Sequence, residues 1–112
     1  MKLLHARTAA HVLHLRSRSY SAHMALGDFY EEVVDFADSI AEAWQGDYGL
    51  IEDFPARYTP YTDPLKLLED LGTWIEDHRA ECGGASDTHI QNIIDEVVAL
   101  IRRTQYKLRF LK

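Results

Sequence analysis

A periodic apolar pattern over residues 20 to 44 constrains the fold of this chain more than any other feature. Apolar or small side chains return every three or four positions, which is the spacing of one face of an α-helix. The residues that form this pattern are Tyr20, Met24, Gly27, Tyr30, Val33, Val34, Ala37, Ile40, Ala41 and Trp44. The pattern predicts a long amphipathic helix that buries this face against other helices.

A column of carboxylates runs beside the apolar face of the predicted helix. Glu31, Asp35, Asp38 and Glu42 follow one another at intervals of four, three and four residues. This spacing places them on one flank of the helix, where like charges repel one another. The column therefore needs either water or a bound cation.

Three histidines precede the carboxylates. His11 and His14 stand at helical spacing, and His23 opens the long helix. Imidazole nitrogen and carboxylate oxygen together suit iron, manganese or zinc better than calcium, which prefers oxygen ligands alone. The chain has no Glu-x-x-His sequence, the usual signature of a di-iron site inside one helical bundle. A metal site enclosed within a single bundle is therefore not supported.

The stretch HVLHL, followed by AHMALGDFYEEVVDFADSIAEAW, resembles the ferroxidase region of the Dps family, the mini-ferritins of the ferritin-like superfamily. The shared pattern is a His-rich first helix, a His at the start of the second, and Asp-x-x-x-Glu near its end. In that family the histidines and the carboxylates come from two subunits that meet at a two-fold axis. The resemblance implies that His14 and His23 bind iron together with Asp38 and Glu42 of a neighbouring copy. The resemblance leaves His11 as a supporting or alternative ligand.

The resemblance covers roughly residues 9 to 46 and leaves two alignments open for the family's first histidine. His11 gives the family's spacing to His23, whereas His14 requires a connection three residues shorter. We favour His14, because a tight hairpin turning near Arg18 would place it level with His23. The short length and the ending YKLRFLK are closest to small Dps-like proteins of bacteriophages.

The resemblance implies a fold, an activity and an assembly. The fold is all-α, a ferritin-like four-helix bundle of two helical hairpins joined by a long crossover. The activity is oxidation of Fe(II) by peroxide or oxygen at a di-iron or mononuclear site, which sequesters iron and protects against oxidation. The site requires at least a homodimer, and the family's assembly is a closed shell. The rival hypothesis is a non-catalytic structural or adaptor protein of the same fold, such as a phage virion or host-interaction component.

Length and composition are those of one domain spanning residues 1–112. The hydrophobic content of 46% supports a modest core. A single cysteine, Cys82, excludes an internal disulfide and suits a reducing cytoplasm. The resemblance implies that this cytoplasm is that of a bacterium or a phage-infected cell. His5 and Arg7 interrupt the apolar opening, which argues against a signal peptide, and no apolar run has the length of a membrane span.

The net charge of −6 is distributed unevenly along the chain. Residues 1–23 carry +4 and residues 102–112 carry +5, with no acid in either segment. Residues 24–101 hold eighteen acids against three basic residues, a net charge of −15. A strongly negative body attracts cations and repels phosphate, so DNA binding through the basic ends is not favoured.

The remaining helices follow from their start and stop signals. We expect a first helix over 2–18, and a stop for the second at Gly46. Residues 46–63 are too apolar for a free linker and are expected to pack along the bundle as the crossover. Asp63-Pro64 begins a third helix that ends at Gly83-Gly84, and Ser86 caps a fourth that runs to about Leu108.

Other reactive side chains are interpreted as structural. His78 and His89 lack acidic partners at ligand spacing on their own helices and are predicted to lie on the surface. Trp44 and Trp74 are predicted to be core or interface residues. Cys82 has no base beside it in the sequence, so a nucleophilic role is not expected.

Overall fold

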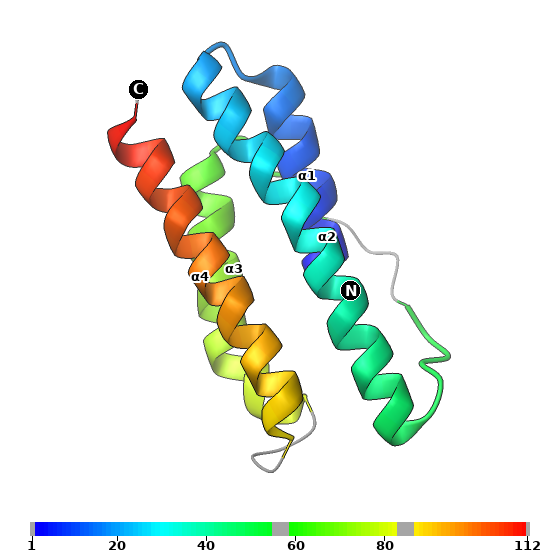
Figure 1. Cartoon of the computed structure of the whole chain (residues 1–112). Coiled ribbons are helices and arrows are strands. Elements are labelled where there is room, and N and C mark those ends of the chain that lie inside the picture. The colour runs from blue at the N-terminus through cyan, green and yellow to red at the C-terminus, as the bar shows by residue number, and fades with distance from the viewer. Residues whose placement is uncertain (1, 55–58, 83–86, 112) are drawn as a thin grey trace.

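The computed structural model describes residues 2–54, 59–82 and 87–111, and every regular element within these ranges is a helix (Figure 1). The helices are α1 (Lys2–Arg16), α2 (Tyr20–Tyr48), α3 (Pro64–His78), the short 3-10 helix η1 (Arg79–Glu81), and α4 (Thr88–Phe110). The prediction of an all-α chain with four main helices is confirmed.

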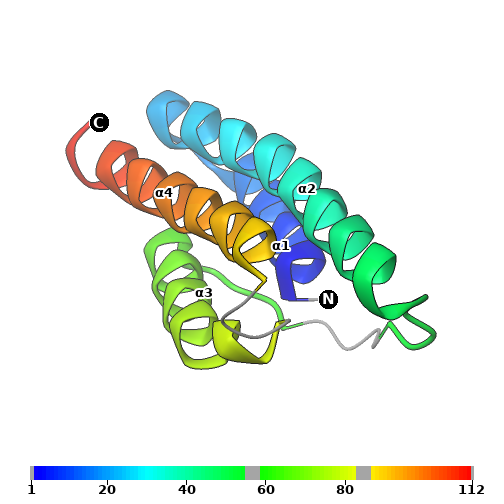
Figure 2. The ribbon, with the colours of Figure 1, turned by 60° about the horizontal axis from the view of Figure 1, so that its bottom comes forward.

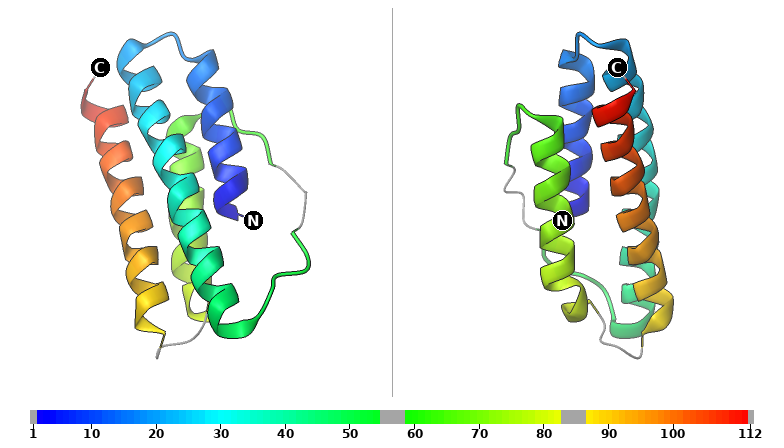
Figure 3. Two further views of the ribbon diagram at one scale, coloured as in Figure 1. Left: turned by 45° about the vertical axis from the view of Figure 1, so that its right-hand side comes forward. Right: turned by 90° about the vertical axis from the view of Figure 1, so that its left-hand side faces the viewer.

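The four helices form an elongated bundle of 43 × 26 × 21 Å. Helix α1 packs on α2 and α3, and α4 packs on α2 and α3, which places α2 and α3 at opposite corners (Figure 2). The hairpins α1–α2 and α3–α4 are each antiparallel (Figure 3). Helix α2 ends at one end of the bundle and α3 begins towards the other, so the connection between them crosses back along the bundle.

The second helix is longer than predicted. It continues through Gly46 to Tyr48, and the residue that follows its end, Gly49, has a φ of 102°. A glycine inside a helix costs only about 1 kcal/mol relative to alanine, whereas the left-handed conformation that closes a helix strongly favours glycine. Gly49 adopts such a positive φ and Gly46 does not, so the predicted stop at Gly46 is wrong.

The second hairpin also differs from its predicted ends. Asp63 caps α3 as expected, because its Oδ1 accepts a bond of 3.1 Å from the Leu65 amide. Helix α3 ends at His78 and η1 follows it, so the helix does not reach Gly83-Gly84. Those glycines and Ser86 lie outside the described residues. The position before α4 is held by Asp87, whose carboxylate makes no capping bond and instead accepts one from the Tyr48 hydroxyl.

The buried face of α2 is rotated from the predicted one. Tyr20 and Met24 are 77% and 45% exposed, whereas Leu26 and Phe29 are fully buried. Helices α1 and α4 both pack on α2, and the surface between them is centred on Leu26, Phe29 and Val33. The main core consists of Ala6, Ala9, Ala10, Leu13, Leu26, Phe29, Val33, Leu67, Leu68, Leu71, Ile75, Ile90, Ile94, Val97, Leu100 and Ile101.

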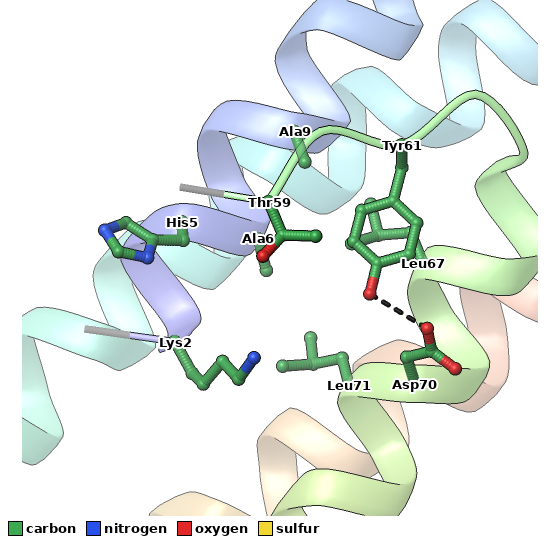
Figure 4. Close-up of a pocket in the computed structure, with 9 residues that line it drawn as sticks. All are labelled: Lys2, His5, Ala6, Ala9, Thr59, Tyr61, Leu67, Asp70 and Leu71. Carbon is green, nitrogen blue, oxygen red and sulfur yellow. Dashed lines mark hydrogen bonds between the residues drawn. The ribbon is translucent and has the colours of Figure 1, made fainter. Parts of the chain in front are cut away.

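The crossover is fixed to the bundle where it approaches α3. The Tyr61 hydroxyl donates to Asp70 Oδ2 at 2.9 Å, and both residues line one side of a small cavity of about 60 Å³ (Figure 4). Hydrogen bonds from Lys66 and Tyr61 lower the pKa of Asp70. Earlier in the crossover, Leu50 remains 82% exposed. The expectation that the crossover packs along the bundle is therefore confirmed at Tyr61 but not at Leu50.

Helix α1 is about half as long as α2 and leaves the second half of α2 partly uncovered (Figure 3). A cavity of about 400 Å³ lies there, and its lining is mostly apolar. Trp44 and Trp74 both contribute to this lining. Trp44 packs against the core, as predicted, whereas Trp74 is 38% exposed and its predicted core or interface role stays a prediction. The part of the bundle around the second half of α2 is thus more open than the part near the α1–α2 turn.

Candidate functional site

The α1–α2 turn brings His14 and His23 face to face. Helix α1 ends two residues after His14, and Ser19 caps α2 through a bond of 3.3 Å from the Ala22 amide to its Oγ. This tight turn places the two imidazoles in a stack, with ring centroids 3.6 Å apart and an interplanar angle of 21°. The predicted hairpin that sets His14 level with His23 is present.

Each histidine is bonded to the backbone of the other. His14 Nδ1 lies 2.6 Å from the His23 carbonyl oxygen, and His23 Nδ1 lies 2.9 Å from the His14 carbonyl oxygen. A carbonyl oxygen can only accept, so Nδ1 must carry the proton in both rings. In the neutral form of each ring, Nε2 is then the nitrogen with a free lone pair. We call this reciprocal arrangement the histidine clasp.

Aromatic and small residues surround the clasp. The Tyr30 ring lies 5.2 Å from that of His14 and 4.2 Å from that of His11, between centroids. The Arg7 guanidinium lies over the Tyr30 ring, 5.7 Å from its centroid. A Cβ on Gly27 would stand only 3.1 Å from His14 Cε1, so glycine permits the close approach of the ring to α2. Both histidines of the clasp are half-buried.

His11 belongs to the same group but not to the clasp. Its ring centroid lies 6.2 Å from that of His14, and it packs mainly on Tyr30. Of the two alignments left open by the sequence, the one through His14 gives a direct stack with His23. His11 is one helical turn away from the pair.

The carboxylates of the predicted site lie elsewhere in the same chain. Asp38 and Glu42 are exposed on the second half of α2, and Glu31 and Asp35 are exposed near its middle. Fifteen residues of α-helix separate His23 from Asp38, which corresponds to about 22 Å along the axis. One chain therefore brings the two predicted nitrogen ligands together, but it does not bring the predicted oxygen ligands near them.

A second group of metal-ligating side chains was not predicted from the sequence. Asp47 at the end of α2, Asp87 before α4 and His89 in the first turn of α4 have ligand atoms within 4.8 Å of one another. His89 Nε2 lies 2.7 Å from Asp47 Oδ2, so His89 does have an acidic partner, although not on its own helix. The antiparallel course of α2 and α4 was the signal that could have revealed this pairing.

Two further side chains that the sequence analysis treats as structural, Cys82 and His78, lie near the end of α3. Burial raises the pKa of the half-buried Cys82 thiol, which disfavours the reactive thiolate. His78 is half-buried at the end of α3, where its Nδ1 lies 2.9 Å from the Trp74 carbonyl oxygen and its ring stacks on the indole. Neither residue contacts the histidine clasp.

Comparison with known proteins places the chain in a family but gives no activity. The profile of DUF5856, a family of unknown function, matches residues 14–108, so the chain belongs to this family. No curated protein and no solved structure matches the chain. Among the described residues, no helix combines the length and the apolar character that crossing a membrane requires.

Proposed function

We propose that this protein binds Fe(II) and promotes its oxidation at a site shared by two copies, in the manner of a mini-ferritin. The histidine clasp is the observation that carries the proposal. Metal-binding histidines typically donate their second ring N–H to a backbone carbonyl or a carboxylate, which fixes the tautomer and the ring orientation. His14 and His23 both have this arrangement.

The donor set fits iron better than the alkaline-earth ions. The two Nε2 atoms of the clasp would supply imidazole nitrogen, and Asp38 and Glu42 of a second copy would supply carboxylate oxygen. Such a mixed set suits first-row transition metals, and its negative charge favours Fe(III) over Fe(II). The acidic segment of residues 24–101 would concentrate Fe(II) around the site.

A two-fold pairing of α1–α2 hairpins would complete the site twice. If the axis passes near the midpoint between His23 and Asp38 on α2, the clasp of each copy faces the carboxylates of the other. The charges are complementary, since residues 1–23 carry +4 and the carboxylate column of α2 is acidic. Leu15 and Tyr20 are 69% and 77% exposed beside the turn, and a partner would cover such apolar side chains.

The reaction needs little from the protein beyond binding and charge. Two Fe(II) ions give one electron each to a peroxide, which takes up two protons and becomes two waters. The clasp would hold its imidazoles in one tautomer throughout, because both Nδ1 atoms keep their protons and donate them to backbone carbonyls. The carboxylates would stabilise the additional positive charge of the oxidised ion.

Anaerobic loading with Fe(II), followed by peroxide, tests the proposal. Wild type should develop the near-ultraviolet absorbance of Fe(III)–oxo species, and His23→Ala and Asp38→Ala should each abolish it. His78→Ala is a matched control, because His78 also places Nδ1 on a carbonyl but sits apart on α3. Glu32→Ala is the matched acidic control on α2. A wild type that stays colourless would instead support the non-catalytic scaffold.

Subunit mixing tests the shared site directly. In a mixed dimer of His23→Ala and Asp38→Ala chains, one site combines an intact clasp with intact carboxylates. Random co-assembly should therefore restore about a quarter of the wild-type absorbance, although each variant alone gives none. Light scattering must also detect at least a dimer. A strictly monomeric protein, or a failure to complement, would contradict the shared site.

A further inference from the structure

We propose that Asp47, Asp87 and His89 form a second metal site, which takes a divalent first-row ion such as Zn²⁺. The site lies where α2 ends and α4 begins, at the end of the bundle opposite the histidine clasp (Figure 1). It is assembled within one chain and does not depend on the proposed ferroxidase function.

The ligand atoms lie close enough together to reach one metal ion after small side-chain rotations. Zinc binds histidine nitrogen and carboxylate oxygen at about 2.0 to 2.2 Å, so two ligand atoms on the same ion lie roughly 3 to 4 Å apart. The three residues offer one ligand atom each, all within 4.8 Å of one another. His89 Nε2 and Asp47 Oδ2 are already 2.7 Å apart. Side-chain rotation alone can open the group around an ion.

The donor types select the class of metal. One imidazole nitrogen and two carboxylate oxygens suit zinc, manganese, iron or cobalt, whereas calcium and magnesium prefer oxygen alone. Asp47 and His89 are exposed and Asp87 is half-buried, so water can fill the remaining coordination positions. The ion would take the place of the hydrogen that His89 and Asp47 now share.

An ordinary ion pair accounts for only part of this arrangement. His89 and Asp47 form a pair, but a second carboxylate, that of Asp87, lies within the same group. Two carboxylates this close repel each other unless positive charge stands between them. The Tyr48 hydroxyl donates to Asp87 Oδ2 and orients that carboxylate, as partners of metal ligands commonly do. A divalent ion would balance both carboxylates.

The fold, not the local sequence, creates the site. His89 and Asp47 are 42 positions apart and meet because α4 returns along α2. A bound ion would therefore link the last turn of α2 to the first turn of α4. Metal binding and the stability of this end of the bundle are coupled as a result.

Calorimetric titration of the full chain with Zn²⁺, together with thermal unfolding, tests the inference. Wild type should bind one ion at this site and unfold at a higher temperature in its presence. His89→Gln and Asp47→Asn should each weaken binding by about tenfold or more. His78→Gln and Asp77→Asn are the matched controls on α3 and should bind as wild type does.

The result must also be separated from the histidine clasp. His23→Ala should retain this zinc binding, because the clasp lies at the other end of the bundle. Circular dichroism should show unchanged helix in every variant, since the substituted side chains are exposed or half-buried. Equal zinc affinity in wild type and His89→Gln would overturn the inference. Loss of binding in His23→Ala alone would overturn it as well, without affecting the proposed iron site.

Discussion

The two ends of the bundle hold histidines in opposite ways. Near the α1–α2 turn, His14 and His23 are half-buried, stacked, and bonded through Nδ1 to backbone carbonyls. At the other end, His89 is exposed and turns its Nε2 towards the side chain of Asp47. The clasp is therefore held by rigid helices, whereas the Asp47–His89 pair is held by side chains alone.

The difference shows what backbone partners give to a histidine. A carbonyl within a helix cannot move away, so the tautomer and position of each clasp ring are fixed before any ligand arrives. A carboxylate on an exposed side chain can rotate, so the group of Asp47, Asp87 and His89 can open around an ion. Breaking the Asp47–His89 pair should cost the protein little stability. The clasp should matter more for stability, and the other group should respond more to added metal.

The largest expected effect is a difference in the free energy of unfolding lost when a histidine is removed from each end. His14→Ala removes a stacked, half-buried ring and its hydrogen bond to the His23 carbonyl, and should lower the free energy of unfolding by about 2 kcal/mol. His89→Ala removes a pair whose side chains are 56% and 39% exposed, and should cost about 0.5 kcal/mol. Urea denaturation measures both. Equal losses would remove the distinction between the two ends.

A smaller effect of opposite sign is expected from two glycines of α2. Alanine at Gly27 meets the clasped His14 ring at 3.1 Å, and the ring is held by its bonds to His23. Gly27→Ala should therefore lower stability by about 1 kcal/mol despite the better helix propensity of alanine. Gly46→Ala has no atom within 4 Å and should raise stability by about 0.5 to 1 kcal/mol.

The same denaturation experiment decides this pair of variants. A gain in stability for both would mean that the His14 ring moves aside freely and that the clasp is not rigid. Nitrogen chemical shifts of His14 in Gly27→Ala give an independent measurement, because a displaced ring should lose the pure Nδ1–H tautomer.

The smallest effect concerns ionisation at the exposed end. The hydrogen bond to Asp87, with smaller contributions from burial and from the charges of Asp87 and Asp47, raises the pKa of Tyr48 to about 12. The bond is fully present below the ordinary value of about 10 and is lost as the pH rises through the higher value. Ultraviolet titration should show one tyrosine ionising late, and Asp87→Asn should return it towards 10. An unchanged titration curve would show that Asp87 does not hold Tyr48.

Much of the helical framework could be predicted because its signals are local. Asp63-Pro64 marked the start of α3, and the serines near residue 19 marked the start of α2. Gly46 misled because a glycine ends a helix only where the chain adopts a positive φ, and the sequence does not say which of Gly46 and Gly49 does so. The buried face of α2 was misplaced for a different reason, since Leu26 and Phe29 are buried only because α1 and α4 cover them.

The sequence by itself determined four helices, a tight turn between His14 and His23, and the spacing of carboxylates along α2. These features depend on residues within a few turns of one another, where helix periodicity and capping act. Only the tertiary structure decided that each imidazole binds the other's carbonyl, and that Asp47, Asp87 and His89 meet. Such contacts depend on how helices pack side by side, and the local sequence around each residue carries no signal of that packing.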